Sequence, residues 1–145
     1  MFTIRWTALI ACVVGLAIAA PSRAAEERLP STDVQAIEQV IRDQLDAFGH
    51  DDAERAWSHS TPEIQKRFGN PYDFMRMVRE NYQAVYRAGS FQFVRLRKVD
   101  GIWSQTVDLV DESGYVWRAT YLMKRQGKGW KIGGCTLTET STIAT

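Results

Sequence analysis

Hydrophobic residues recur every three or four positions in the first half of the chain and every two positions in the second half. The first pattern is clearest between residues 34 and 48. Because this spacing puts side chains on one face of a helix, it predicts a long amphipathic helix that starts at Pro30-Ser31-Thr32 and ends at Gly49. Thr32 and Gln35 have the spacing of a capping box at its first turn. The predicted buried stripe consists of Val34, Ile37, Val40, Ile41, Leu45 and Phe48.

Start and stop signals predict further, shorter helices. Asp51 and Glu54 form a capping pair ahead of a helix over about residues 52–59. Thr61-Pro62 begins a helix that ends at Gly69, since proline favours the first helical position and glycine the position after the last. Asn70-Pro71 begins another, which the apolar spacing extends to about residue 87.

After Gly89 the alternation of apolar and polar residues predicts four β-strands. The first covers about residues 90–99, where a change of phase predicts a β-bulge or a strand with both faces half-buried. Hairpin turns are expected at residues 111–114 and 126–129. Helices followed by an antiparallel meander predict an α+β fold rather than a doubly wound sheet.

The N-terminus has the three parts of a secretory signal peptide. A short basic region ends at Arg5, an apolar run of fifteen residues spans 6–20, and Ser22 and Ala24 supply small residues for cleavage after Ala24. A retained membrane anchor is the alternative, but a spanning helix needs about 20 apolar residues. Lipidation of Cys12 is disfavoured, because the apolar run continues after it. The pattern predicts a periplasmic or secreted protein.

Cleavage defines the expected organisation of the chain. We expect a cleaved signal peptide at residues 1–24, a flexible leader at 25–30, a single domain at 31–138 and a flexible tail at 139–145. Cleavage removes two of the 18 basic residues and none of the 17 acidic ones, so the net charge changes from +1 to −1. A nearly neutral chain without a basic cluster argues against a nucleic-acid partner. Membrane contact is expected only through the signal peptide before cleavage.

Several motifs resemble those of a known bacterial family. They lie at residues 44–48, at Asp52 and 56–57, at 61–65, at 74–78 and at 82–86. Together they resemble domain-of-unknown-function family 4864, which is grouped with proteins similar to nuclear transport factor two and ketosteroid isomerase. The resemblance implies a cystatin-like cone, in which N-terminal helices pack on a curved four-stranded antiparallel sheet. That superfamily contains isomerases, dehydratases, hydrolases and binding modules, so the fold leaves function open.

The sequence offers little catalytic machinery. An isomerase-like site needs a carboxylate base over the pocket and a neutral oxyanion donor. Asp108 alternates with Val107 and Leu109, which predicts a solvated sheet face for it. His50 and His59 lack metal-ligand spacing, and Cys135 is expected to be a small buried residue rather than a nucleophile. We expect no catalytic residue, no metal and no cofactor.

Aromatic residues are the main candidates for a binding site. Tyrosine and tryptophan combine an apolar body with a polar group, and several come from elements that converge on one interior. They form either the core alone or the lining of a small apolar pocket. Arg118 lies either inside, where it would meet an anionic group, or on the outer sheet face. The candidate pocket comprises Trp57, Tyr82, Tyr86, Trp103, Trp117, Tyr121 and Arg118.

These observations favour an exported, non-catalytic module that binds a small apolar ligand or a protein partner. A homodimer through the outer sheet face is a further expectation. The alternative is a pocket enzyme that performs proton transfer on a hydrophobic substrate, as an isomerase or dehydratase does. A purely structural envelope role is the third hypothesis.

Overall fold

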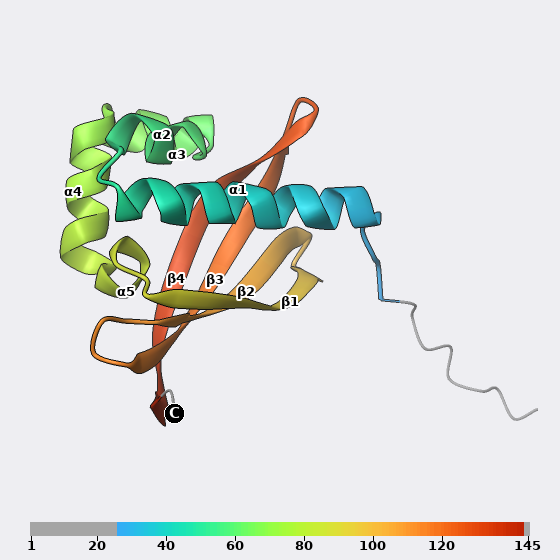
Figure 1. Ribbon diagram of the computed structural model, residues 1–145. Coiled ribbons are helices and arrows are strands. Elements are labelled where there is room, and N and C mark those ends of the chain that lie inside the picture. The colour runs from blue at the N-terminus through green and yellow to red at the C-terminus, as the bar shows by residue number, and fades with distance from the viewer. Residues whose placement is uncertain (1–25, 144–145) are drawn as a thin grey trace, which may run out of the picture.

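A computed structural model of the protein describes residues 26–143 (Figure 1). The predicted signal peptide lies outside the described residues. Within them, no helix is both long and apolar enough to cross a membrane. The helical half comprises α1 (Ser31–Gly49), α2 (Ala53–Ser58), α3 (Pro62–Phe68), α4 (Pro71–Asn81) and α5 (Gln83–Tyr86).

Helix α1 lies across one face of the sheet, and the shorter helices gather at its C-terminal end (Figure 1). Of its predicted apolar stripe, Ile37, Ile41, Leu45 and Phe48 are buried, and the first two are fully inaccessible, whereas Val34 and Val40 are half-buried. The predicted capping box of Thr32 and Gln35 is wrong, because the N-cap is Pro30 and Thr32 lies inside the helix. The Pro30 carbonyl accepts hydrogen bonds from the backbone N–H groups of Asp33 and Val34 instead.

The corner after α1 is built around Asp51. This residue has a φ of 55°, so it, and not Gly49, makes the left-handed turn. Its carboxylate accepts hydrogen bonds from the Tyr86 hydroxyl and from Arg87, whose Nη2 lies 2.8 and 2.9 Å from the two oxygens. These donors lower the pKa of Asp51. The predicted capping role belongs to Asp52, which accepts from the backbone N–H of Arg55 at 3.1 Å.

The caps of α3 and α4 agree with the sequence signals. Thr61 and Asn70 accept hydrogen bonds from the third residue beyond them, and Gly69 ends α3 with a φ of 80°. The predicted single helix to residue 87 is wrong, because it breaks at Tyr82. Beyond the break, the three consecutive residues 84–86 of α5 are all buried.

The strands are β1 (Ser90–Val99), β2 (Ile102–Val110), β3 (Tyr115–Gln126) and β4 (Gly129–Ile143), paired antiparallel in chain order. The register shifts between Phe93 and Arg95, which confirms the predicted bulge and leaves Val94 exposed. This bulge keeps Phe93 and Leu96 opposite inner-face residues of β2. Strand β4 pairs with β3 as far as Ile143, so it continues beyond the predicted end at residue 138.

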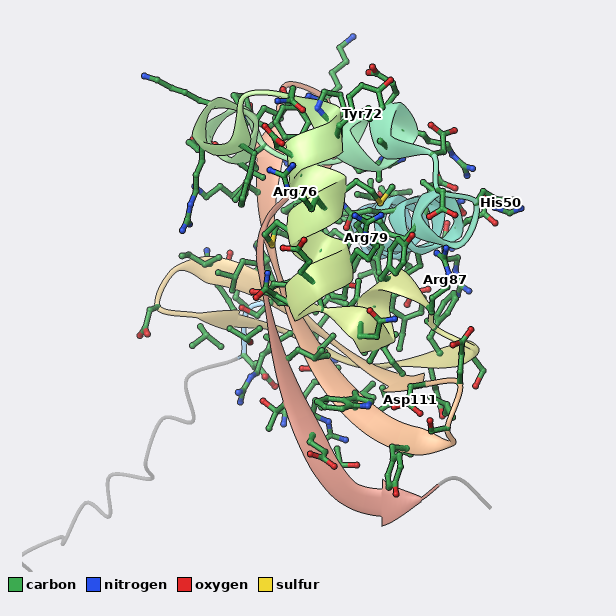
Figure 2. The ribbon with its side chains drawn as sticks, turned by 90° about the vertical axis from the view of Figure 1, so that its left-hand side faces the viewer. His50, Tyr72, Arg76, Arg79, Arg87 and Asp111 are labelled. Carbon is green, nitrogen blue, oxygen red and sulfur yellow. The ribbon has the colours of Figure 1, made fainter. Side chains whose placement is uncertain are left out.

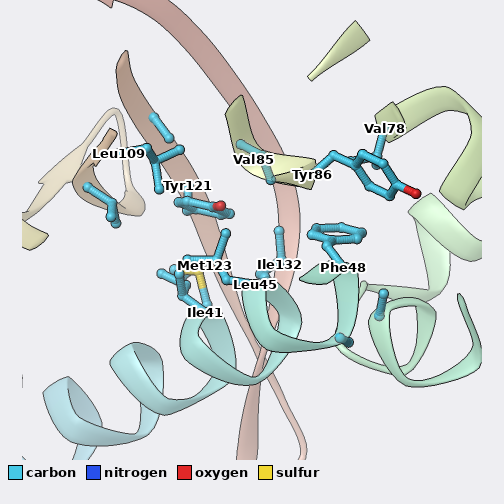
Figure 3. Packing of buried hydrophobic residues seen from close by; sticks show 14 of the residues in the cluster. Ile41, Leu45, Phe48, Val78, Val85, Tyr86, Leu109, Tyr121, Met123 and Ile132 are labelled. Carbon is cyan, nitrogen blue, oxygen red and sulfur yellow. The ribbon is translucent and has the colours of Figure 1, made fainter. Parts of the chain in front are cut away.

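The core lies between α1 and the inner face of the sheet, and the predicted α+β architecture is confirmed. Figure 3 shows Ile41 and Leu45 of α1 facing Tyr121 and Met123 of β3, with Leu109 of β2 beside them. All five are buried.

We expect Ile41→Ala to lower the free energy of unfolding by about 2–5 kcal/mol, because it removes a fully buried side chain and leaves a cavity. Chemical denaturation measures the change. Ile102→Ala is the matched control, since this isoleucine is 38% exposed and its truncation should cost less than about 1 kcal/mol. Equal losses in both variants would contradict the assignment of the core.

Candidate functional site

A cavity of about 80 Å³ lies between the C-terminal half of α1, helices α3 to α5, and strands β3 and β4. One water molecule needs roughly 10–15 Å³, so the space exceeds that of a single buried water. Its wall is mostly hydrocarbon and aromatic: Phe48, Ile64, Phe68, Phe74, Met77, Val78, Val85 and Ile132. The cavity therefore suits a small, mainly apolar molecule.

Phe74 organises the helical wall. Its ring lies 5.5 Å from that of Trp57, 5.8 Å from that of Phe68 and 6.1 Å from that of Phe48, measured between centroids. Such tilted pairs add to the free energy of area burial. Phe48 and Phe74 are buried, so this wall is well packed.

The exposure of the lining residues distinguishes the floor of the cavity from its mouth. Val78, Val85 and Tyr121 are buried and form the floor. Half-buried residues from α3, from α4 and its end, and from β4 form the mouth: Ile64, Phe68, Met77, Tyr82 and Cys135. A ligand would therefore enter between these helices and β4.

The floor carries an unusual polar group. The Tyr121 hydroxyl is buried in a residue that is 1% exposed, and it has no hydrogen-bond partner among the described residues. Burial raises the pKa of this phenol well above its usual value, so it is neutral and keeps its proton. Gln44 and Ser60 are further buried polar residues of the lining, and Gln44 donates from Nε2 to the Ala56 carbonyl at 3.1 Å.

No carboxylate or imidazole lines the cavity within the described part of the chain. Cys135 does line it, but burial raises the pKa of this thiol to about 12. His59 lies outside the lining, and burial lowers its pKa, which favours the neutral ring. Between residues 26 and 143, no three His, Cys, Asp or Glu side chains gather as a metal site requires.

Of the predicted pocket residues, Tyr82 and Tyr121 line the cavity. Trp57 packs behind the wall, against Phe74. Tyr86 turns to the opposite side, where its hydroxyl donates to Asp51 and the Arg87 guanidinium stacks 3.8 Å from its ring. Figure 2 shows this side of the molecule, with Arg87 to the right of the lower half of α4.

The other three predicted residues lie elsewhere. Trp103 is at the far end of the sheet, with the Lys98 ammonium 5.7 Å from its ring. Trp117 donates from Nε1 to the carboxylate of Asp111 at 2.8 Å. Asp111 belongs to the β2–β3 hairpin and is labelled in Figure 2. Arg118 makes a two-pronged ion pair with Asp108, with both distances 2.8 Å. This pair is on the outer sheet face, which remains the predicted dimer interface.

Sequence reasoning missed most of the wall. The apolar spacing places Phe48 on the stripe of the first helix and gives no site role to Phe74 or Gln44. Gln44 does carry a signal, since it lies three residues after Ile41 and four before Phe48, on the buried stripe. A buried amide on such a stripe requires a partner or a pocket.

Helices that close an apolar cavity over an antiparallel sheet define a class of α+β pocket proteins. The chain belongs to the family described as domain of unknown function DUF4864, whose model matches residues 30–145. No curated protein matches the chain. A solved structure from Streptomyces avermitilis, described as a candidate dehydratase of the NTF2-like family, is similar at 15% identity. The two structures superpose with a TM-score of 0.47, and the match covers 78% of this chain and 100% of that one.

We expect alkylation of Cys135 at pH 8 to be at least about 100-fold slower in the folded protein than in the unfolded chain. A pKa of about 12 leaves little thiolate at this pH, whereas an ordinary thiol titrates near 8.5. Iodoacetamide labelling followed by peptide mass spectrometry measures both rates. A folded rate within tenfold of the unfolded one would contradict the raised pKa of this thiol.

Proposed function

We propose that the protein is an exported, non-catalytic binding module that holds one small, mainly apolar molecule in the cavity between α1, α3, α4, α5 and the sheet. The observation that carries this proposal is the lining itself. Hydrocarbon and aromatic side chains surround a neutral, unpartnered hydroxyl at the floor. Ligand sites typically combine an apolar wall with few polar groups in this way.

The chemistry of the lining supports binding rather than catalysis. Proton transfer needs a general base whose pKa lies near the working pH and which reaches the ligand. Besides Tyr82 at the mouth, the acidic groups in the wall are Tyr121 and Cys135, and burial raises the pKa of both. Both therefore hold their protons near pH 7, so neither is a suitable base.

A pocket enzyme is the second candidate, and the neutral Tyr121 hydroxyl favours it, because such a group donates a hydrogen bond to a developing oxyanion. Solvent exchange separates the two functions. In D2O, an enzyme that abstracts protons would exchange the α-protons of a bound ketone such as cyclohexanone. We expect exchange at the rate of buffer alone, and protein-dependent exchange would refute the non-catalytic assignment.

Binding is tested with toluene as the probe and Met77→Trp as the variant. Met77 is half-buried at the mouth, so a larger ring there should weaken toluene binding at least tenfold. Ligand-observed NMR measures the dissociation constant. At 100 times that constant, toluene should also raise the stability of the wild type by about 2.7 kcal/mol.

Arg76→Trp is the matched control for this variant. Arg76 precedes Met77 on the same helix, and its side chain is 58% exposed and points outward (Figure 2). Affinity should stay within twofold of wild type. Equal weakening in both variants, or no binding of toluene to the wild type, would contradict the assignment of the cavity as a ligand site.

Export is tested separately by expressing the full chain in a bacterium with a secretory pathway. The signal pattern predicts that the mature protein begins at Ala25 and is recovered from the periplasm or medium. Intact mass and N-terminal peptide analysis identify the cleavage site. Recovery of the uncleaved chain from the cytoplasm would refute export.

A further inference from the structure

The buried hydroxyl of Tyr121 constrains the chemistry of the ligand. Tyrosine hydroxyls that leave water normally find a hydrogen-bond partner, and this one has none among the described residues. Tyr121 lies on β3 between Gln105 of β2 and Cys135 of β4, at the centre of the inner face. Figure 3 shows its ring projecting into the core beside Leu109 and Val85.

Three further polar side chains line the cavity, those of Gln44, Ser60 and Tyr82, and among these four residues Tyr121 is the one whose side-chain oxygen is buried without a partner in the described part of the chain. The Nε2 of Gln44 is engaged by the Ala56 carbonyl, and a thiol such as that of Cys135 is a weak donor. Gln105 has a buried, unpartnered Oε1, but it does not line the cavity. The proton of the Tyr121 hydroxyl therefore has no bonded acceptor among the described residues, and an acceptor atom in the cavity would supply one.

We propose that the ligand is a small neutral molecule with one hydrogen-bond-accepting oxygen, such as a ketone, ester or ether. The oxygen accepts from the Tyr121 hydroxyl, and the hydrocarbon part packs against Phe48, Phe74 and Val78. This inference rests on the proposed function and narrows it from apolar molecules in general to one class.

The charge of the lining excludes ionised ligands from this class. None of the residues around the cavity is Lys, Arg, Asp or Glu. Moving a carboxylate or an ammonium group into such a wall removes its hydration without supplying an opposite charge. A neutral oxygen loses far less hydration, and the phenol replaces the hydrogen bond that it had with water.

Three six-membered-ring probes of matched shape test the proposal: cyclohexanone, methylcyclohexane and cyclohexanecarboxylate. Dissociation constants are measured by ligand-observed NMR at pH 7 for the wild type, Tyr121→Phe and the control Tyr115→Phe. Tyr115 is on the same strand but 46% exposed. In the wild type we expect cyclohexanone to bind at least tenfold more tightly than the carboxylate.

Tyr121→Phe should raise the dissociation constant of cyclohexanone at least tenfold and leave that of methylcyclohexane within twofold of the wild type. Tyr115→Phe should change neither dissociation constant. In infrared spectra of the wild type, the C=O stretch of bound cyclohexanone should move to lower frequency than in hydrocarbon solvent. This second measurement needs no variant and therefore does not depend on how Tyr121→Phe folds.

Other outcomes overturn the inference in distinguishable ways. If methylcyclohexane binds but Tyr121→Phe leaves cyclohexanone unchanged, or the C=O stretch does not move, the cavity is a binding site and the hydroxyl is not its anchor. A buried water on Tyr121 would give this result. If cyclohexanecarboxylate binds the wild type as tightly as cyclohexanone does, the cavity does not select neutral ligands. If no probe binds the wild type, both this inference and the proposed function fail.

Discussion

The packing of α1 across the inner face of the sheet is the constraint on which the rest of the structure depends. Its stripe of Ile37, Ile41, Leu45 and Phe48 covers the strands and forms the helical side of the core. The N-terminal part of this contact is closed by direct packing. The four short helices gather at the C-terminal end of α1 (Figure 1). The cavity exists because their side chains meet β3 and β4 without filling the space completely.

Polar contacts hold these short helices where hydrophobic packing alone would leave them free to shift. Asp51 ties α5 to the end of α1 through Tyr86 and Arg87, and Arg87 also donates to the Phe48 carbonyl at 2.6 Å. On the other side, the segment before α3 joins β4: the Thr61 N–H donates to the Ile132 carbonyl at 2.9 Å, and the Ile132 N–H donates to the His59 carbonyl at 2.8 Å. The cavity thus has one wall fixed to α1 and another fixed to the sheet.

The elements were predictable because their signals are local, whereas the site was not, because it depends on contacts between distant segments. Caps at Thr61 and Asn70 and the bulge after Phe93 follow from neighbouring residues alone. The break at Tyr82 does not, because α5 begins there without a side-chain cap. Aromatic content also misled the site prediction. Trp103 and Trp117 share the inner face with Tyr121, but they lie at the ends of the sheet, and only the three-dimensional arrangement separates them from the cavity.

The central claim is that the interior keeps an apolar space at the C-terminal end of α1 rather than closing into a continuous core. Xenon tests this most directly, because it enters empty apolar cavities and needs no assumption about the natural ligand. A crystal of the mature protein pressurised with xenon should show one strong site among Phe48, Phe74 and Val78. A crystal that binds no xenon there, with the side chains of this wall in contact with β3 and β4, would contradict the account.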